Sequence, residues 1–178
     1  MNDVGNKGER IVRDYFEGIK YDVTPAPNRK FYSYDMECNH QDHSFTIEVK
    51  TDVSAYKHAA RRGEPDNPRL FIEFYNETID EPSGIAASLA TYYFYLLVNN
   101  DQNIVCNVFK KKDLFLYLLD SDTRKHTLHP SFGDHQTTGW LPYLGDLKDK
   151  KILKRQFVIG EWWYFAHILP REGGIRCI

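Results

Sequence analysis

The sequence predicts a mixed α/β fold in which helices flank a mixed β-sheet, and three observations support this class. An amphipathic helical pattern covers residues 5–18. Residues 31–52 and residues 91–109 each contain two β-rich runs around a polar turn. Residues 110–120 then carry apolar side chains at helical spacing. The chain of 178 residues is long enough to bury a real core, and we expect one domain over residues 1–178.

The composition indicates a soluble globular protein. Hydrophobic residues make up 42% of the chain and charged residues 27%. No apolar run has membrane-spanning length and no signal-peptide pattern opens the chain, so we expect a cytoplasmic protein without a membrane partner. The three cysteines lack metal-ligand spacing and fit reduced thiols. A net charge of −2 counts mildly against tight nonspecific DNA binding, while 15% aromatic residues fit either a strand-rich core or a nucleic-acid surface.

The helical pattern near the start of the chain places an acidic residue at the edge of an apolar stripe. The stripe consists of Ile11, Val12, Tyr15, Phe16 and Ile19. Gly18 is a suitable terminator for this helix. The side chain of Glu9 can reach solvent, pair with Arg13 four residues on, or reach an adjacent site.

The segment 31–52 is the centre of the prediction, because its two strands bring acidic residues together. Apolar and polar residues alternate along both strands, as in a half-buried hairpin. A two-residue turn at 41–42 would place Asp35 directly across from Glu48, with Cβ atoms roughly 4.5–5.5 Å apart. Lys50 projects from the same face, because residues two apart on a strand point the same way.

Two opposed carboxylates repel each other, and a divalent cation offsets that repulsion. Mg²⁺ suits such hard oxygen ligands, since it binds one or two carboxylates and completes its shell with water and phosphate oxygens. A lysine beside the metal can orient an attacking water or stabilise charge on a phosphate. The hairpin therefore predicts a site that cleaves phosphodiester bonds, with Mg²⁺ as the cofactor and Mn²⁺ as a substitute.

Asp35 followed by Glu48-Val49-Lys50 on the next strand resembles the motif of the PD-(D/E)XK nuclease superfamily. Tyr34 stands where the superfamily usually has proline. The resemblance implies a restriction-endonuclease-like core, with Asp35 and Glu48 as metal ligands and Lys50 as a catalytic residue. Formal matches to the same triplet at 146–148 and 149–151 lie in a charged segment without strand alternation, and we set them aside.

The first helix adds to this resemblance. Lys7-Gly8-Glu9-Arg10 before an apolar helix is similar to the first helix of many superfamily members, including archaeal-type Holliday-junction resolvases. The resemblance implies that Glu9 supports the metal site as a further ligand and catalytic residue.

Two groups of residues are candidates for contacts with DNA phosphates. The first group follows the hairpin and fits either phosphate binding or an exposed, solvated loop; it consists of Lys57, Arg61 and Arg62. The second lies in a predicted short helix over residues 83–90, whose small side chains allow close packing on a sheet or on a nucleic acid. This helix resembles one that lines the substrate cleft in phage-type and restriction-like superfamily members, so Ser83 and Ser88 are candidates.

The remaining segments complete the expected fold. The run 70–75 predicts a central strand, and residues 148–155 are basic with a helical pattern. Three histidines lack zinc-ligand spacing and are assigned to a polar loop; they are His126, His129 and His135. A short strand is expected over 20–25, and an apolar strand or helix over 161–169.

These patterns favour a Mg²⁺-dependent DNA nuclease. An endonuclease is favoured over an exonuclease, because the chain is small and lacks a Gln-x-x-x-Tyr helix like that of lambda-type exonucleases. Junction resolution and restriction-like cutting both remain open, both often involve homodimers, and the composition resembles that of bacteriophage nucleases. The alternative is a DNA- or protein-binding module with a weakened site on the same fold.

Overall fold

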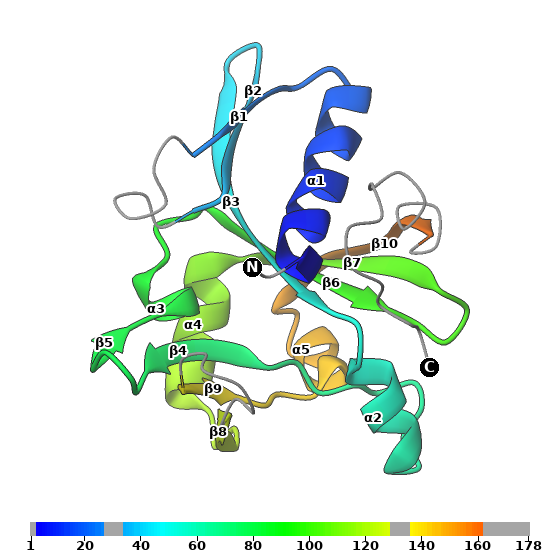
Figure 1. Cartoon of the computed structure of the whole chain (residues 1–178), viewed down its shortest axis with the longest axis vertical. Coiled ribbons are helices and arrows are strands. Elements are labelled where there is room, and N and C mark those ends of the chain that lie inside the picture. Colours follow the sequence, from blue (N-terminus) through cyan, green and yellow to red (C-terminus); the bar gives the residue numbers. More distant parts are fainter. Residues whose placement is uncertain (1–2, 27–33, 129–135, 162–178) are drawn as a thin grey trace.

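The computed structural model describes residues 3–26, 34–128 and 136–161 (Figure 1). The helices are α1 (Asp3–Gly18), α2 (Ala55–Arg61), α3 (Gly84–Ala87), α4 (Lys111–Asp120) and α5 (Leu144–Asp149). The strands are β1 (Asp22–Pro25), β2 (Met36–His40), β3 (His43–Asp52), β4 (Ile72–Asn76), β5 (Glu81–Pro82), β6 (Tyr92–Val98), β7 (Asn103–Lys110), β8 (Lys125–Leu128), β9 (Thr137–Trp140) and β10 (Leu153–Glu161).

These strands form two sheets. The main sheet has the order β1-β2-β3-β6-β7-β10, and the small sheet has the order β5-β4-β9-β8. Within the main sheet β3 and β6 pair in parallel, while β2 with β3 and β6 with β7 pair antiparallel. The predicted class, a mixed α/β fold with helices flanking a mixed sheet, is therefore confirmed.

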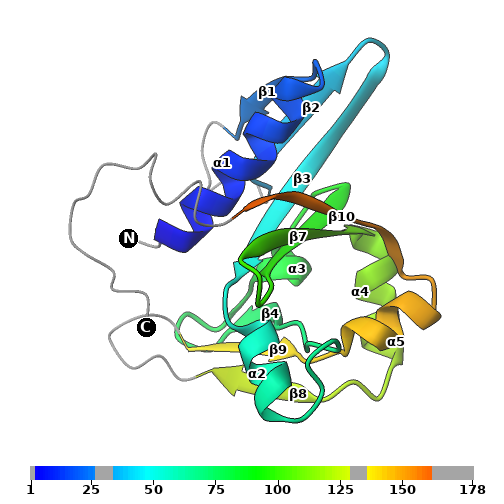
Figure 2. The same ribbon diagram turned by 90° about the vertical axis from the view of Figure 1, so that its right-hand side faces the viewer.

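Apolar side chains cover both faces of the main sheet. On one face α1 packs Ile11, Val12 and Phe16 against alternate residues of β3, β6 and β7. On the other face the small sheet, α4 and α5 enclose a second core, and Figure 2 shows these two layers on opposite sides of the main sheet. The central strand β6 is buried on both faces, which explains its unbroken apolar sequence from Tyr92 to Val98.

The hairpin at the centre of the prediction forms as expected. His40 pairs with His43 across the two-residue turn, and Met36 pairs with Ile47. Gln41 adopts a positive φ of 51° in that turn. Alternation along β3 sends Ile47 and Val49 into the core beneath α1, so the side chains of Glu48 and Lys50 project from the opposite face.

Four predictions require correction. The run 70–75 supplies β4 of the small sheet and not a strand of the main sheet. The helix expected over 83–90 is one turn long, because the chain becomes extended at Ser88, where ψ is 136°. The segment 148–155 divides between α5 and β10. Ile19 is 48% exposed, because it lies beyond the last residue of α1.

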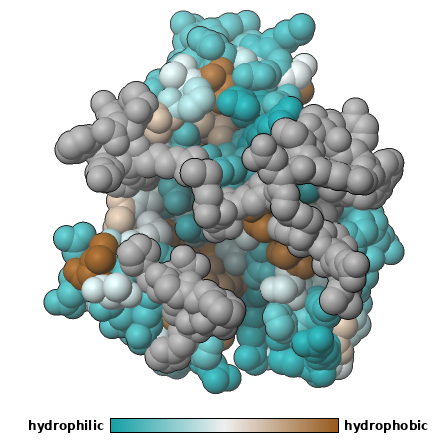
Figure 3. Space-filling model, in the orientation of Figure 1, coloured by the Kyte–Doolittle hydropathy of each residue, from teal (hydrophilic) through white to brown (hydrophobic). Residues whose placement is uncertain are grey.

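Two further observations concern the surface and the chain as a whole. Figure 3 shows a mostly hydrophilic face with apolar side chains in separate small patches. None of the helices that the structure describes is long and apolar enough to cross a membrane. Residues 162–169 of the predicted closing element, together with His129 and His135, lie outside the described residues, and His126 is an exposed residue of β8.

Candidate active site

The candidate site lies near the middle of β3, where β3 stops pairing with β2 on one edge and begins pairing with β6 on its other edge. We call this point the fork. The first half of β3 pairs with β2 as far as Ile47, and its second half pairs with β6 from Ile47 onward. Asp35 stands directly before β2 at this fork. Its backbone N–H donates to the Ile47 carbonyl at 2.9 Å, and its Oδ2 accepts a hydrogen bond from the Val49 N–H at 2.7 Å. The Asp35 carboxylate is thereby fixed beside β3, next to Glu48.

Glu48 and Lys50 occupy the second half of β3. Their Cα partners on β6 are Tyr93 and Tyr95, which belong to the core on the small-sheet side. Because paired residues on neighbouring strands share a face of the sheet, Glu48 lies beside Tyr93 and Lys50 beside Tyr95. The two residues of the predicted motif therefore line one edge of that core.

Burial and nearby charged side chains determine the electrostatics around Glu48. Burial is the first cause that raises its pKa, to about 8, and the charge of Asp35 is the second. Glu9 and Glu73 also raise the pKa of Glu48, while Lys50 lowers it. Like charges thus face one another here, and an additional positive charge would stabilise the ionised form of Glu48.

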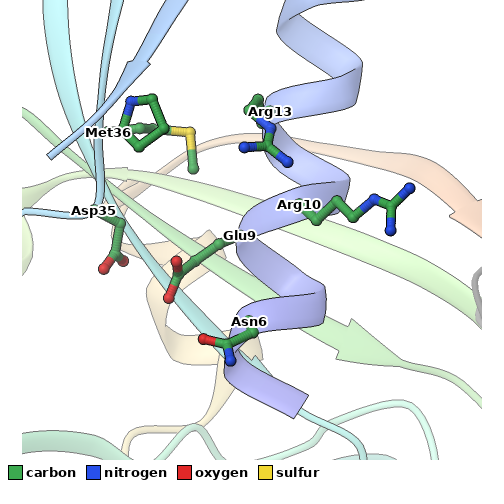
Figure 4. Close-up of a pocket in the computed structure, with 7 residues that line it drawn as sticks. Asn6, Glu9, Arg10, Arg13, Asp35 and Met36 are labelled. Atoms are coloured by element: carbon green, nitrogen blue, oxygen red, sulfur yellow. The ribbon is translucent and has the colours of Figure 1, made fainter. Parts of the chain in front are cut away.

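Glu9 reaches the same place from α1. It lines a pocket together with Asn6, Arg10, Arg13, Pro25, Asp35 and Met36. Figure 4 shows the carboxylates of Glu9 and Asp35 directed into this space. Glu9 therefore lines the same pocket as Asp35, and Arg13 lines it too.

A glycine allows α1 to approach the fork so closely. A Cβ atom added at Gly8 would overlap the Thr51 hydroxyl, so no larger residue fits there without displacement. Gly8 directly precedes Glu9, and the contact between α1 and β3 therefore sets how far Glu9 reaches toward Asp35.

The oxygen donors at the fork fit Mg²⁺ or Mn²⁺. Among the described residues no group of three His, Cys, Asp or Glu side chains forms a ready-made metal site. Asp35 and Glu48 nevertheless provide the one or two carboxylates by which Mg²⁺ is usually held, its other positions being filled by water and phosphate. The donors of Asp35, Glu48 and Glu9 are all hard oxygens, which exclude a preference for soft metals.

Sequence reasoning missed Glu73 of β4. Tyr95 and the backbone of Phe71 exchange two hydrogen bonds, at 3.0 and 3.2 Å, which bring β4 against the main sheet beside the site. Glu73 follows two residues later and acts on both Glu48 and Tyr93. The signal in the sequence was a single carboxylate inside the apolar run LFIEFY.

The candidates for phosphate contacts lie in different environments. Lys57 and Arg61 are exposed on α2, and Arg62 is exposed just after it, with an ion pair to Glu64 at 3.4 Å. Figure 1 shows α2 beyond the end of β3, away from the fork. Arg10 and Arg13 border the pocket itself, and their position beside Glu9 was the signal that sequence reasoning passed over.

Of the two serine candidates, Ser88 is buried and Ser83 is half-buried. Ser88 is 2% exposed and its hydroxyl accepts a hydrogen bond from the Ala90 N–H at 3.2 Å. This burial contradicts a phosphate contact by Ser88, and the cause is the early end of α3. The Ser83 hydroxyl is also buried, and it has no hydrogen-bond partner among the described residues.

The comparisons with known proteins give one distant structural similarity. A bacterial homing endonuclease, I-Ssp6803I, aligns with a TM-score of 0.46 and 14% sequence identity, over 74% of this chain and 86% of the endonuclease. No family model matches the chain, and no curated protein matches it by sequence. At this level of similarity, the interpretation of the site depends on its own geometry.

Proposed function

We propose that this protein is a divalent-metal-dependent DNA nuclease that hydrolyses phosphodiester bonds, acting as an endonuclease. The observation that carries the proposal is the fork in the main sheet. There the backbone of β3 holds the Asp35 carboxylate at 2.7 Å from the Val49 nitrogen, beside Glu48 and with Lys50 two residues on. Two carboxylates and a lysine in this arrangement suit the hydrolysis of a phosphodiester.

Each residue has a distinct role in the proposal. Asp35 and Glu48 would hold Mg²⁺ or Mn²⁺, and Glu9 would support them from α1. When bound, the ion supplies an activated water and positive charge on the scissile phosphate. Lys50 orients that water and stabilises the negative charge that develops on the phosphate oxygens.

The same geometry suggests how DNA is held. Arg10 and Arg13 border the pocket that contains Glu9 and Asp35. A guanidinium group can bind a phosphate with two parallel hydrogen bonds. We assign these two arginines to phosphates adjacent to the scissile bond, and the exposed Lys57 and Arg61 of α2 to phosphates further along the strand.

A cleavage assay with a matched pair of variants tests this proposal. Labelled linear duplex, single-stranded, flap and four-way-junction DNA would be incubated with the protein in Mg²⁺, in Mn²⁺ and in EDTA. Lys50→Ala should abolish cutting while leaving DNA binding and thermal stability nearly unchanged. Lys148→Ala, which removes an exposed lysine of α5 from one of the triplets set aside in the sequence, should cut like the wild type.

The outcome also separates an enzyme from a binding module. Internal cuts that require a metal ion and disappear in the Lys50 variant support the endonuclease, and the preferred substrate defines its subclass. DNA binding without cutting, and without metal binding in calorimetry, would instead identify a binding module on this fold.

A further inference from the structure

Leu89, between α3 and β6, is an apolar side chain that projects into solvent beside the candidate site. It is 74% exposed, the largest value among the large apolar side chains of the described residues. Its two neighbours, Ser88 and Ala90, are buried, so the chain is anchored in the protein on both sides of Leu89. A single exposed leucine needs no explanation of its own, and its surroundings decide whether it has a role.

Hydrogen bonds fix the backbone around Leu89. The Ser88 hydroxyl accepts a hydrogen bond from the Ala90 N–H at 3.2 Å, across the intervening Leu89. The Thr91 N–H then lies 3.0 Å from both the carbonyl oxygen and the hydroxyl of Thr46 on β3. Leu89 is therefore presented on an ordered segment, and little backbone freedom would be lost when its side chain is buried against a ligand.

The same hydrogen bonds place Leu89 near the fork. Thr46 directly precedes Ile47, the residue at which β3 passes from β2 to β6, and it shares a face of β3 with Glu48. Residues are about 3.4 Å apart along a strand and about 4.8 Å apart between strands, so at most about 20 Å separates the Cα atoms of Leu89 and Glu48. Successive base pairs of duplex DNA are about 3.4 Å apart. DNA with its scissile phosphate at the fork would therefore pass Leu89 within about six base pairs of that phosphate.

Two exposed lysines lie beside this segment. The Lys111 N–H donates to the Thr91 carbonyl at 3.1 Å, which brings the start of α4 next to the segment. Lys110 and Lys112 carry exposed side chains before and after Lys111. Lys110 also lies two strands away from Ile47, in the row of paired residues that crosses β7, β6 and β3. An exposed apolar side chain beside cations fits DNA, whose phosphates bind ammonium groups and whose base steps accept apolar wedges.

We propose that Leu89 is an apolar wedge that inserts between two bases of the DNA bound at the fork, while Lys110 and Lys112 hold neighbouring phosphates. The inference rests on the proposed nuclease function, because it takes DNA to lie over the fork. Insertion requires a base step to be unstacked, which costs free energy in a regular duplex. A duplex with a bulged or mismatched base has already lost part of that stacking. The DNA that this site prefers is therefore a duplex with interrupted stacking.

The binding of two matched DNA duplexes tests the wedge. One duplex is fully paired, and the other carries a single bulged nucleotide with 2-aminopurine beside it. The parent protein is the full chain with Lys50→Ala, in Mg²⁺, so that the DNA stays intact. We expect the parent to bind the bulged duplex about tenfold more tightly and Leu89→Ala to bind both equally, the factor that burial of one leucine side chain provides. The fluorescence of 2-aminopurine should rise when the parent binds and stay unchanged when the Leu89 variant binds.

Three further variants of the parent separate the wedge from other roles. Leu89→Met keeps a long apolar side chain and should keep the preference for the bulged duplex. Lys112→Ala should weaken the binding of both duplexes by the same factor, because a phosphate contact does not depend on base stacking. Leu128→Ala, which removes a 43% exposed side chain from β8 of the small sheet, is the matched control and should change neither affinity.

The outcomes distinguish this inference from the proposed function. Equal binding of the two duplexes by the parent, or a preference that survives in Leu89→Ala, would overturn the wedge, and metal-dependent cutting by the wild type would still support the nuclease. A parent that binds neither duplex would overturn the wedge, and a wild type that also cuts no DNA would overturn both proposals. Because Leu89 is exposed, Leu89→Ala should have the Tm of the parent, so that a lost preference reports a lost contact with DNA.

Discussion

Replacement of Glu48 by glutamine should stabilise the metal-free protein while removing a ligand of the proposed metal site. Burial and the charge of Asp35 raise the pKa of Glu48 from the ordinary 4.5 to about 8. The folded protein therefore binds this proton more tightly than the unfolded chain does. In consequence the contribution of Glu48 to the free energy of unfolding is lost as the pH rises from 4.5 toward 8.

The size of the effect follows from the same pKa values. Each pH unit above the unfolded pKa lowers the free energy of unfolding by about 1.4 kcal/mol until the folded group ionises. At pH 7 the total loss of stability is on the order of 3 kcal/mol. The glutamine in the Glu48→Gln variant would have the shape of the protonated side chain at every pH and would avoid this cost. For a chain of this size, about 3 kcal/mol corresponds to a rise in Tm of roughly 6–12 °C.

Thermal unfolding in EDTA, followed by circular dichroism between pH 4 and pH 9, measures the difference. The Tm values of wild type and Glu48→Gln should agree at the acidic end and separate as the pH rises. Addition of Mg²⁺ should then raise the Tm of the wild type only, because a ligand that binds the folded state stabilises it. Glu17→Gln, an exposed change on α1, controls for the loss of one negative charge.

Two results would refute this reasoning. A constant difference in Tm at all pH values would mean that the proton on Glu48 is not the cause. A variant less stable than the wild type at pH 7 would mean that the carboxylate has a favourable partner, which contradicts burial beside Asp35 as the main influence on Glu48.

Three further predictions concern the surroundings of the fork. Gly8→Ala should lower Mn²⁺ affinity and metal-dependent cutting by about tenfold, because the new methyl group displaces α1. Adding Thr51→Ala to the same chain removes the overlapping hydroxyl and should restore both quantities. Arg13→Ala should weaken the binding of duplex DNA uniformly across sequences and reduce the salt dependence of that binding by about one released ion. Fluorescence anisotropy at several salt concentrations measures both effects. Arg155→Ala, on the exposed part of β10, serves as the control and should change neither. Cys38 and Cys106 should resist alkylation at pH 8 in the folded protein, because burial raises the pKa of Cys38 to about 12 and that of Cys106 still further. Mass spectrometry of a Cys177→Ser variant, with and without denaturant, measures the extent of alkylation. Rapid labelling of the folded protein would contradict the prediction.

The hairpin was predictable because its signals are local. Alternation along β3 assigns Ile47 and Val49 to one face, and a two-residue turn then sets which residue lies opposite Glu48. These rules need no knowledge of the rest of the chain. The helix α1 was predictable for the same reason, since its stripe has the helical period.

Glu73 and the fate of Ser88 were not predictable in this way, because both depend on contacts between distant segments. The run that contains Glu73 has the sequence of a buried strand, and no local signal assigns it to the small sheet. The helix that begins after Ser83 ends after four residues because Gly84 crosses closely over Glu73 and the chain then turns toward β6. Propensity alone predicts a longer helix there.

The fork itself explains why Asp35 must be tested with two different variants. Where β3 leaves β2, the Val49 N–H has the Asp35 carboxylate as its acceptor, in a partly buried position. Asp35→Ala removes both the proposed metal ligand and that acceptor, so it should lower the free energy of unfolding by about 1–3 kcal/mol as well as abolish cutting. Asp35→Asn keeps an oxygen that can accept the same hydrogen bond but loses the charge, so it should abolish Mg²⁺ binding and cutting at nearly unchanged stability. Chemical denaturation and calorimetry of the two variants give both quantities. If Asp35→Asn bound Mg²⁺ like the wild type, Asp35 would have only a structural role at the fork, and the proposed metal site would have to be assigned without it.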